Sequence, residues 1–153
     1  MALAPQPELT KDFWNNPSFV RSFMGDYGFR SEIEPKISRS EQEILRQVVA
    51  KAENQLLDAI TYLEGKIDLE SSAALDFALA TMYYQASRLT SARKTYLQAI
   101  TKFPSFLRAH KNLGFVHLNL NEYDKATIHL TKAISLGDGD GVTYVALGFC
   151  QLS

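Results

Sequence analysis

The sequence of 153 residues predicts an all-α protein built as a solenoid of helix-turn-helix units, and three observations lead to this fold class. Residues of matching size recur 34 positions apart over the second half of the chain. Apolar residues within each unit recur at intervals of three and four, which is the period of one helix face. No segment shows the sustained polar–apolar alternation of a half-buried strand, so we expect no sheet.

Composition narrows the possible functions. Hydrophobic residues make up 46% of the chain, as in a protein with a folded core. The net charge of -1 gives no general attraction to nucleic acid or to an anionic membrane, and we expect no nucleic-acid partner. No apolar run reaches the roughly 20 residues of a membrane span. The single cysteine, Cys150, excludes an internal disulfide and a zinc site made of cysteines.

The first residues of the sequence do not determine the cellular compartment of the protein. "MALAPQP" lacks the basic region and the apolar core of a signal peptide, whereas Ala2-Leu3-Ala4 fits the small-residue pattern of a cleavage site. A cytoplasmic location and export followed by signal removal both agree with this start.

Residues 1–39 are predicted to form an N-terminal arm and an irregular, aromatic-rich extension. Prolines and glycines interrupt any long helix here, namely Pro17, Gly25, Gly28 and Pro35. Exposed aromatic rings are unfavourable in water, so we predict that part of 13–29 covers the N-terminal helices or the concave face of the repeats. The aromatic residues of this segment are Phe13, Trp14, Phe19, Phe23, Tyr27 and Phe29.

Residues 40–72 are predicted to form a capping helix or a degenerate repeat. Ser40 and Glu43 have the spacing of a capping box, in which the hydroxyl and the carboxylate each accept from a backbone N–H at the start of a helix. Apolar residues at helical spacing follow as far as Leu63, and Gly65 is placed to end the helix. One long helix fits this pattern, and so does a pair of helices that bends near Asn54.

From Ser72 onward the pattern is helix, turn, helix. Full units are predicted at 73–106 and 107–140, and residues 141–153 form the first helix of a further, truncated unit. Pro104 and the "GDGDG" run interrupt the chain between units. A fragment of a longer array would end in this way. The predicted helices span 72–87, 90–102, 106–119, 122–135 and 141–152.

The period and the residues resemble the tetratricopeptide repeat family, whose 34-residue units are pairs of helices. Its Leu-Gly signature stands at Leu113-Gly114 and recurs as Leu79-Ala80 and as Leu147-Gly148. The second helices carry the family's small and large residues in order, at Ala92, Tyr96 and Ala99, then at Ala126, Leu130 and Ala133. The resemblance implies a right-handed superhelix, in which stacked units bury what one helical pair cannot bury alone.

The resemblance also implies a function, namely a protein–protein interaction scaffold without catalysis or cofactor. Its partner peptide or helix would bind the concave face, which is lined by the first helix of each unit. Lys111 and Asn112 stand at positions with which chaperone-tail binders hold a carboxylate, but Phe77, Phe115 and Ala146 occupy others, which argues against that ligand. The predicted contact residues are Phe77, Thr81, Tyr84, Arg108, Lys111, Asn112, Phe115, Asn119, Val145 and Phe149.

Two other arrangements remain open for these surfaces. Another part of the same chain would cover the aromatic residues equally well. Alternatively, the protein is a structural module that forms homo-oligomers through the open last helix.

The residue types that carry chemistry do not form a catalytic or metal-binding set in the sequence. The three histidines lack a nearby cysteine or carboxylate set and occupy packing positions: His110, His117 and His129. Asp138 and Asp140 lack the remaining ligands of a calcium loop, so we expect a turn. Cys150 is expected to pack inside the last helix. We therefore expect no enzyme, no metal and no cofactor.

Overall fold

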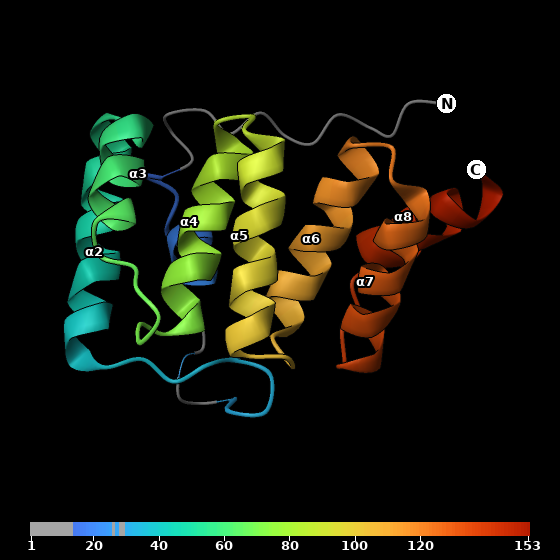
Figure 1. Cartoon of the computed structure of the whole chain (residues 1–153), viewed down its shortest axis with the longest axis horizontal. Coiled ribbons are helices and arrows are strands. Elements are labelled where there is room, and N and C mark those ends of the chain that lie inside the picture. The colour runs from blue at the N-terminus through green and yellow to red at the C-terminus, as the bar shows by residue number, and fades with distance from the viewer. Residues whose placement is uncertain (1–13, 26, 28–29) are drawn as a thin grey trace.

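The computed structural model of the chain describes residues 14–25, 27 and 30–153. These residues form helices and turns without a strand, as the sequence predicts. Helices α2 to α8 follow one another across the molecule, each packed against the next (Figure 1). A helix long and apolar enough to cross a membrane is not found among the described residues.

The extension contains a short helix, α1 (Pro17–Met24), so its described part is not irregular throughout. The side chain of Asn16 caps this helix by accepting from the backbone N–H groups of Ser18, at 2.9 Å, and Phe19, at 3.3 Å. Pro17 takes the first helical position, where its missing N–H has no partner to lose. Pro17 therefore begins a helix, whereas the sequence suggested that it interrupts one.

The next segment is a pair of helices, α2 (Arg39–Asn54) and α3 (Leu56–Glu64), which pack against each other. Gln55 between them is extended, with φ -152 and ψ 116. The structure thus confirms the pair of helices that bends near Asn54, and the alternative of one long helix is wrong. Gly65 follows the last residue of α3, as predicted.

The capping box at the start of α2 lies two residues earlier than predicted. Ser38, not Ser40, accepts from the N–H of Glu41 at 3.2 Å, and Glu41, not Glu43, accepts from the N–H of Ser38 at 2.8 Å. The two Ser-x-x-Glu sets overlap in the sequence, and a tertiary contact favours the first. The second carboxylate oxygen of Glu41 accepts from the N–H of Ser72 at 2.7 Å, which ties α2 to the first repeat.

The repeats form two complete helical pairs and one further helix. The first pair is α4 (Ala73–Gln85) and α5 (Leu89–Lys102), and the second is α6 (Leu107–Asn119) and α7 (Tyr123–Ser135). Helix α8 (Gly141–Leu152) follows them. The predicted bounds agree with these helices within two residues at every end.

Close approach between α6 and α7 depends on Gly114. A Cβ atom placed on this residue would lie 2.6 Å from Cδ2 of Leu130, nearer than real Cβ contacts come. Leu113 and Leu130 are completely buried beside it. The structure therefore confirms that the Leu-Gly pair marks the crossing of two helices.

The extension packs on the N-terminal helices, as predicted. Trp14 and Phe23 are buried in one cluster with Leu45, Val48 and Ile60, and their rings meet edge to face at 5.0 Å between centroids. Phe19 packs against the same cluster. Phe13 and Phe29, which belonged to the same prediction, lie outside the described residues. The aromatic side chains of α1 are thus part of the core of the fold.

Candidate partner-binding surface

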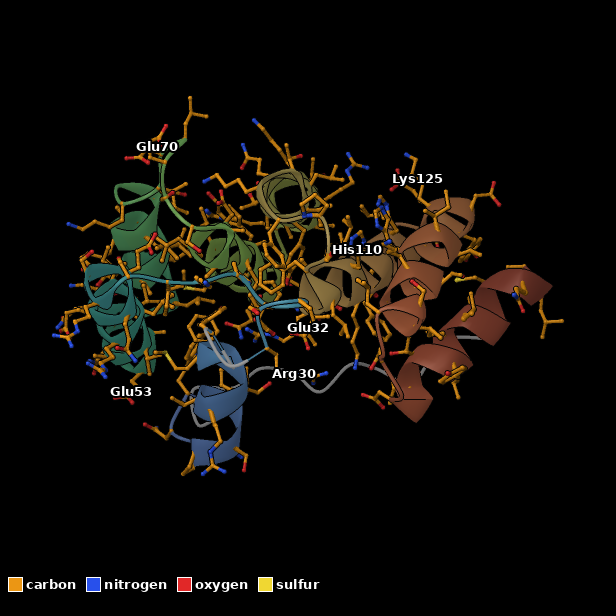
Figure 2. All side chains as sticks on the ribbon, turned by 90° about the horizontal axis from the view of Figure 1, so that it is seen from below. Arg30, Glu32, Glu53, Glu70, His110 and Lys125 are labelled. Atoms are coloured by element: carbon orange, nitrogen blue, oxygen red, sulfur yellow. The ribbon has the colours of Figure 1, made fainter. Side chains whose placement is uncertain are left out.

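The concave face predicted from the sequence consists of α4, α6 and α8, the first helices of the three units. In the view from below, α1 (blue) and the chain that follows it lie on the side of α4 and α6, whereas α5 lies on the other side (Figure 2). The extension therefore lies against the N-terminal part of the concave face.

Arg108, at the start of α6, is engaged by this extension. Its Nε and Nη2 donate to the two carboxylate oxygens of Glu34, at 2.6 Å and 3.0 Å, and its Nη1 donates to the backbone oxygen of Ser22. The guanidinium also lies over the ring of Phe77, 4.6 Å from the centroid. Glu34 is 4% exposed and Phe77 is 3% exposed. Two of the predicted contact residues are thus occupied by another part of the same chain.

Gly25 allows the extension to reach this position. Its φ of +68 is one that side-chain-bearing residues rarely adopt, and a Cβ there would lie 2.0 Å from Nη2 of Arg108. The backbone of Ile33 adds a further link, since its oxygen accepts from the N–H of Leu107 at 3.3 Å. Arg108 and Leu107 together therefore join the extension to the start of α6, through Ser22 and Glu34 for Arg108 and through Ile33 for Leu107.

A chain of hydrogen bonds joins α4, α5 and α6 further along the concave face. Asn112 donates to the hydroxyl oxygen of Tyr96 at 3.1 Å, and the Tyr96 and Thr81 hydroxyls are 2.8 Å apart. Because Thr81 donates its own proton to the oxygen of Phe77, Tyr96 is the donor to Thr81. Burial raises the pKa of Tyr96, which keeps its hydroxyl protonated as this order requires.

A second polar contact lies at the C-terminal end of α6. Asn119 donates to the hydroxyl of Tyr84 at 2.8 Å and to the backbone oxygen of Phe115 at 3.0 Å. Phe115 itself is 9% exposed, whereas Asn119 is exposed. The structure thus joins Tyr84 and Asn119, as well as Thr81 and Asn112, into one surface.

Lys111 is paired with the turn that precedes α8. Its Nζ lies 2.8 Å from Asp140 and 3.5 Å from Asp138. The hydrogen bond from Lys111 lowers the pKa of Asp140, which also caps α8 by accepting from the N–H of Val142 at 3.1 Å. The "GDGDG" run is thus a turn, as expected, and it neutralises Lys111. Both basic residues that the sequence placed on the concave face are therefore bound to carboxylates of the same chain.

The apolar residues of α8 extend the surface beyond α6. Val145 is 66% exposed, and Phe149 is half-buried with its ring edge-on to Tyr123 at 5.8 Å between centroids. These are the two predicted contact residues furthest from the extension.

The contributions of Glu34 and Tyr96 were not among the predicted site residues. Tyr96 was assigned to packing, and nothing in its local sequence shows that its hydroxyl reaches α4 and α6. Glu34 lies between Ile33 and Pro35 in a short segment without helical spacing, so no periodicity marks it. Only the position of Tyr96 could have indicated this role. It lies one helix away from Thr81 and Asn112, whose hydroxyl and amide groups can pair with a tyrosine hydroxyl.

The histidines form a row between α6 and α7, with His129 stacked on both His110 and His117. The Nδ1 atoms of His110 and His129 are 3.2 Å apart, and Nδ1 of His117 is 2.6 Å from Glu122. Burial lowers the pKa of His110 and of His117, and burial with the two neighbouring rings lowers that of His129 to about 4. The three imidazole rings are therefore packed within the fold in their neutral form.

Other chemically active residue types are also packed in the fold. Cys150 is buried in a cluster with Leu130 and Ala146, and burial raises the pKa of its thiol, which disfavours the reactive thiolate. Over the parts of the chain that the structure describes, no three metal-ligating side chains come together in a group that could hold a metal ion.

Comparison with protein families agrees with the geometry. The family described as tetratricopeptide repeat matches residues 49–106 and again residues 77–140, which together span more than half of the chain. No curated protein sequence matches the chain significantly. The matched residues run from within α2 to the end of the second complete unit, and the observed helical pairs have the architecture of that family. The chain therefore belongs to the tetratricopeptide repeat family.

Proposed function

We propose that the chain is a scaffold that binds a segment of a partner protein along the concave face, beyond the residues that the extension engages, and that it catalyses no reaction. Tetratricopeptide repeats in general mediate protein–protein interactions and are non-catalytic, which supports the class of function. The proposed binding surface includes Tyr84 on α4, Asn112 and Asn119 on α6, and Val145 and Phe149 on α8.

The observation that carries the proposal is the pair of asparagines on α6. Asn112 and Asn119 are two turns apart on one face, and each uses its side-chain N–H within the fold. Within the described residues, neither side-chain oxygen accepts a hydrogen bond. Seven helical residues span about 10 Å, close to three residues of an extended chain. A partner in the extended polyproline II conformation makes one turn in three residues, with a rise of about 3.1 Å per residue. Its backbone N–H groups three residues apart therefore point the same way, about 9 Å apart, and would match these two oxygens.

The charges of this surface indicate the composition of the partner. Arg108 is neutralised by Glu34, and Lys111 by Asp138 and Asp140. The basic residues that an acidic tail would bind on this surface are therefore already paired with carboxylates of the same chain. The neighbouring Val145 and Phe149 instead favour a segment with apolar side chains. We accordingly propose an uncharged, partly apolar peptide in extended conformation.

Selection from a library of displayed random peptides on the 153-residue chain tests the proposal. Binding of the enriched peptides is then measured by fluorescence anisotropy. Val145→Asp should weaken their binding by at least about tenfold, because it places a charge in an apolar contact. The double variant Asn112→Ala with Asn119→Ala should weaken it as well.

Ile128→Asp is the matched control, since Ile128 is similarly exposed, at 65%, but lies on the second helix of its unit. It should leave peptide affinity unchanged. Failure to enrich any peptide would refute the proposal. So would equal effects of the changes at Val145 and Ile128, because binding would then not distinguish the two faces.

A further inference from the structure

The side-chain oxygens of Asn112 and Asn119 are fixed by their surroundings as hydrogen-bond acceptors. Because the Tyr96 hydroxyl gives its proton to Thr81, the group of Asn112 that faces Tyr96 at 3.1 Å is the NH2 donor. The backbone oxygen of Phe115 can only accept, so the group of Asn119 that faces it at 3.0 Å is also the NH2 donor. Neither amide can therefore turn over to offer a donor to a ligand.

Both oxygens are open to a ligand. Asn119 is exposed and Asn112 is half-buried. Over the described residues, the buried side-chain atoms that lack a hydrogen-bond partner belong to Tyr27, Asp76 and Gln85, so the oxygen of Asn112 is not one of them. The surface thus presents two acceptors, and a ligand that satisfies them must bring two donors.

The spacing of the two oxygens defines which donors fit. Seven residues of α6 fall only about 20° short of two full turns, so both side chains leave the helix on nearly the same side, about 10 Å apart. In a polyproline II chain the N–H groups of residues i and i+3 face one side, about 9 Å apart, whereas those of i+1 and i+2 face other directions. A ligand bound in this way leaves the two middle N–H groups unused.

Proline is the residue that suits these two middle positions. It has no N–H, so it cannot stand at i or i+3, but it loses no hydrogen bond at i+1 or i+2. Its ring fixes φ at about -65°, and it also drives the preceding residue into the extended region. Prolines at the middle positions therefore hold the free peptide in its bound conformation, and less conformational entropy is lost on binding.

The apolar residues beside α6 agree with such a ligand. Val145 is 66% exposed, and Phe149 packs against the cluster that contains Phe115, which lies between the two asparagines in the sequence. Proline-rich segments in the polyproline II conformation bind other domains at surfaces lined by aromatic residues. The same surface thus offers both the hydrogen-bond acceptors and the apolar contacts.

We propose that the partner segment carries the pattern Xaa-Pro-Pro-Xaa in the polyproline II conformation, where neither Xaa is proline and their N–H groups bind Asn112 and Asn119. This inference rests on the proposed function and specifies the ligand of the same surface. Residues other than proline at the middle positions bind more weakly, because they leave the free peptide less ordered.

Two synthetic peptides of identical composition test the spacing. Pro-Pro-Leu-Pro-Pro-Leu-Pro-Pro has two backbone N–H groups three residues apart, whereas Pro-Pro-Leu-Pro-Leu-Pro-Pro-Pro has them two residues apart. Both are acetylated and end in a dimethylamide, so they contain no other N–H. In calorimetric titrations of the 153-residue chain, the first should bind at least about fivefold more tightly, because the second can pair only one asparagine at a time.

A third peptide, Pro-Pro-Leu-Ala-Ala-Leu-Pro-Pro, tests the two prolines. It keeps the N–H groups of both leucines three residues apart but frees the middle of the chain. Each proline should contribute about two- to fivefold in affinity, so this peptide should bind at least about fourfold more weakly than the first.

Variants of the full chain locate the contact. Asn119→Ala should bring the first peptide to the affinity of the second, because a single acceptor remains. Asn54→Ala is the matched control, since Asn54 is exposed and donates to the backbone oxygen of Ala50 four residues earlier, as Asn119 does to Phe115. It should leave both affinities unchanged, and thermal melting shows that both variants are folded.

Several results would overturn the proposal. They are equal affinity of the wild type for the first two peptides, a preference between them that Asn119→Ala leaves intact, a third peptide as tight as the first, and binding of none of the three. In each case, enrichment of other peptides from the random library would leave the proposed function standing, so the two failures are distinguishable.

Discussion

The carboxylate of Glu34 and the guanidinium of Arg108 form two parallel hydrogen bonds, at 2.6 Å and 3.0 Å, between residues 74 positions apart in the sequence. Both groups are largely withdrawn from water, with side-chain exposures of 6% for Glu34 and 20% for Arg108. A paired geometry of this kind is among the stronger polar contacts in proteins. It fixes the extension against the start of α6.

Glu34→Ala should destabilise the protein by about 3 kcal/mol, because it leaves the largely buried cation of Arg108 without its counterion. Urea unfolding followed by circular dichroism measures this change. Glu32→Ala is the matched control, since Glu32 is exposed two residues earlier, and it should cost less than about 0.5 kcal/mol. Equal unfolding midpoints for the two variants would show that the ion pair does not hold the extension.

Phe23→Ala should lower the free energy of unfolding by about 3–5 kcal/mol, because it opens a cavity among Trp14, Leu45 and Val48. Leu69→Ala, at a position that is 92% exposed, should have almost no effect. Trp14 is the only tryptophan, so its fluorescence reports the docking of the extension directly. In the wild type, this signal and helical circular dichroism should change at the same urea concentration. Fluorescence loss well before helix loss would mean that the extension undocks independently.

Gly114→Leu should destabilise the protein by about 1–3 kcal/mol or more, because even the first atom of its side chain meets Leu130. Gly148→Leu makes the same change at the equivalent position of α8, where a Cβ meets open space, and should stabilise the helix by up to about 1 kcal/mol. Thermal melting of both variants checks the prediction. If the Gly114→Leu protein melted at the wild-type temperature, the assignment of Gly114 to the crossing of α6 and α7 would be wrong.

Stability should fall as the pH is lowered from 7 towards 5, because of the histidine row. The unfolded chain binds a proton at His129 with a pKa near 6.5, whereas burial and its two neighbours hold the folded value at about 4. Between these values the unfolded state binds more protons, so acid favours unfolding. The loss should be on the order of 1–2 kcal/mol, since the ring is only partly buried and water screens it.

Urea midpoints measured across this pH range for the wild type and for His129→Phe test the histidine contribution. The variant should show a shallower dependence on pH. Asp76 acts in the opposite direction, because burial raises its pKa in the folded state, so the difference between the two proteins is the informative quantity. Parallel curves for both proteins would exclude His129 as the cause.

The repeat architecture follows from the sequence because its contacts recur at a fixed spacing. Gly114 meets Leu130 within one unit, and the equivalent residues lie 34 positions away, so period and residue size together indicate which helices cross. The bounds of α4 to α8 were predicted within two residues for the same reason, since proline, glycine and the helical period are local signals.

The start of α2 shows where local signals no longer suffice. Ser38 and Ser40 carry equivalent capping-box patterns, and the bond from Glu41 to the N–H of Ser72 distinguishes them. That bond exists only once α2 lies against the first repeat.

Which of the predicted contact residues are engaged by other parts of the chain was likewise decided by the tertiary structure. The sequence alone predicts five of these residues equally as contacts on the concave face, namely Phe77, Arg108, Asn112, Asn119 and Val145. The sequence also indicated that the aromatic extension must cover some surface, but not which one. Its contacts with Arg108 join segments that share no period, through the carboxylate of Glu34 and the positive φ of Gly25. Such pairings carry no signal in the sequence, because only the folded chain brings their atoms together.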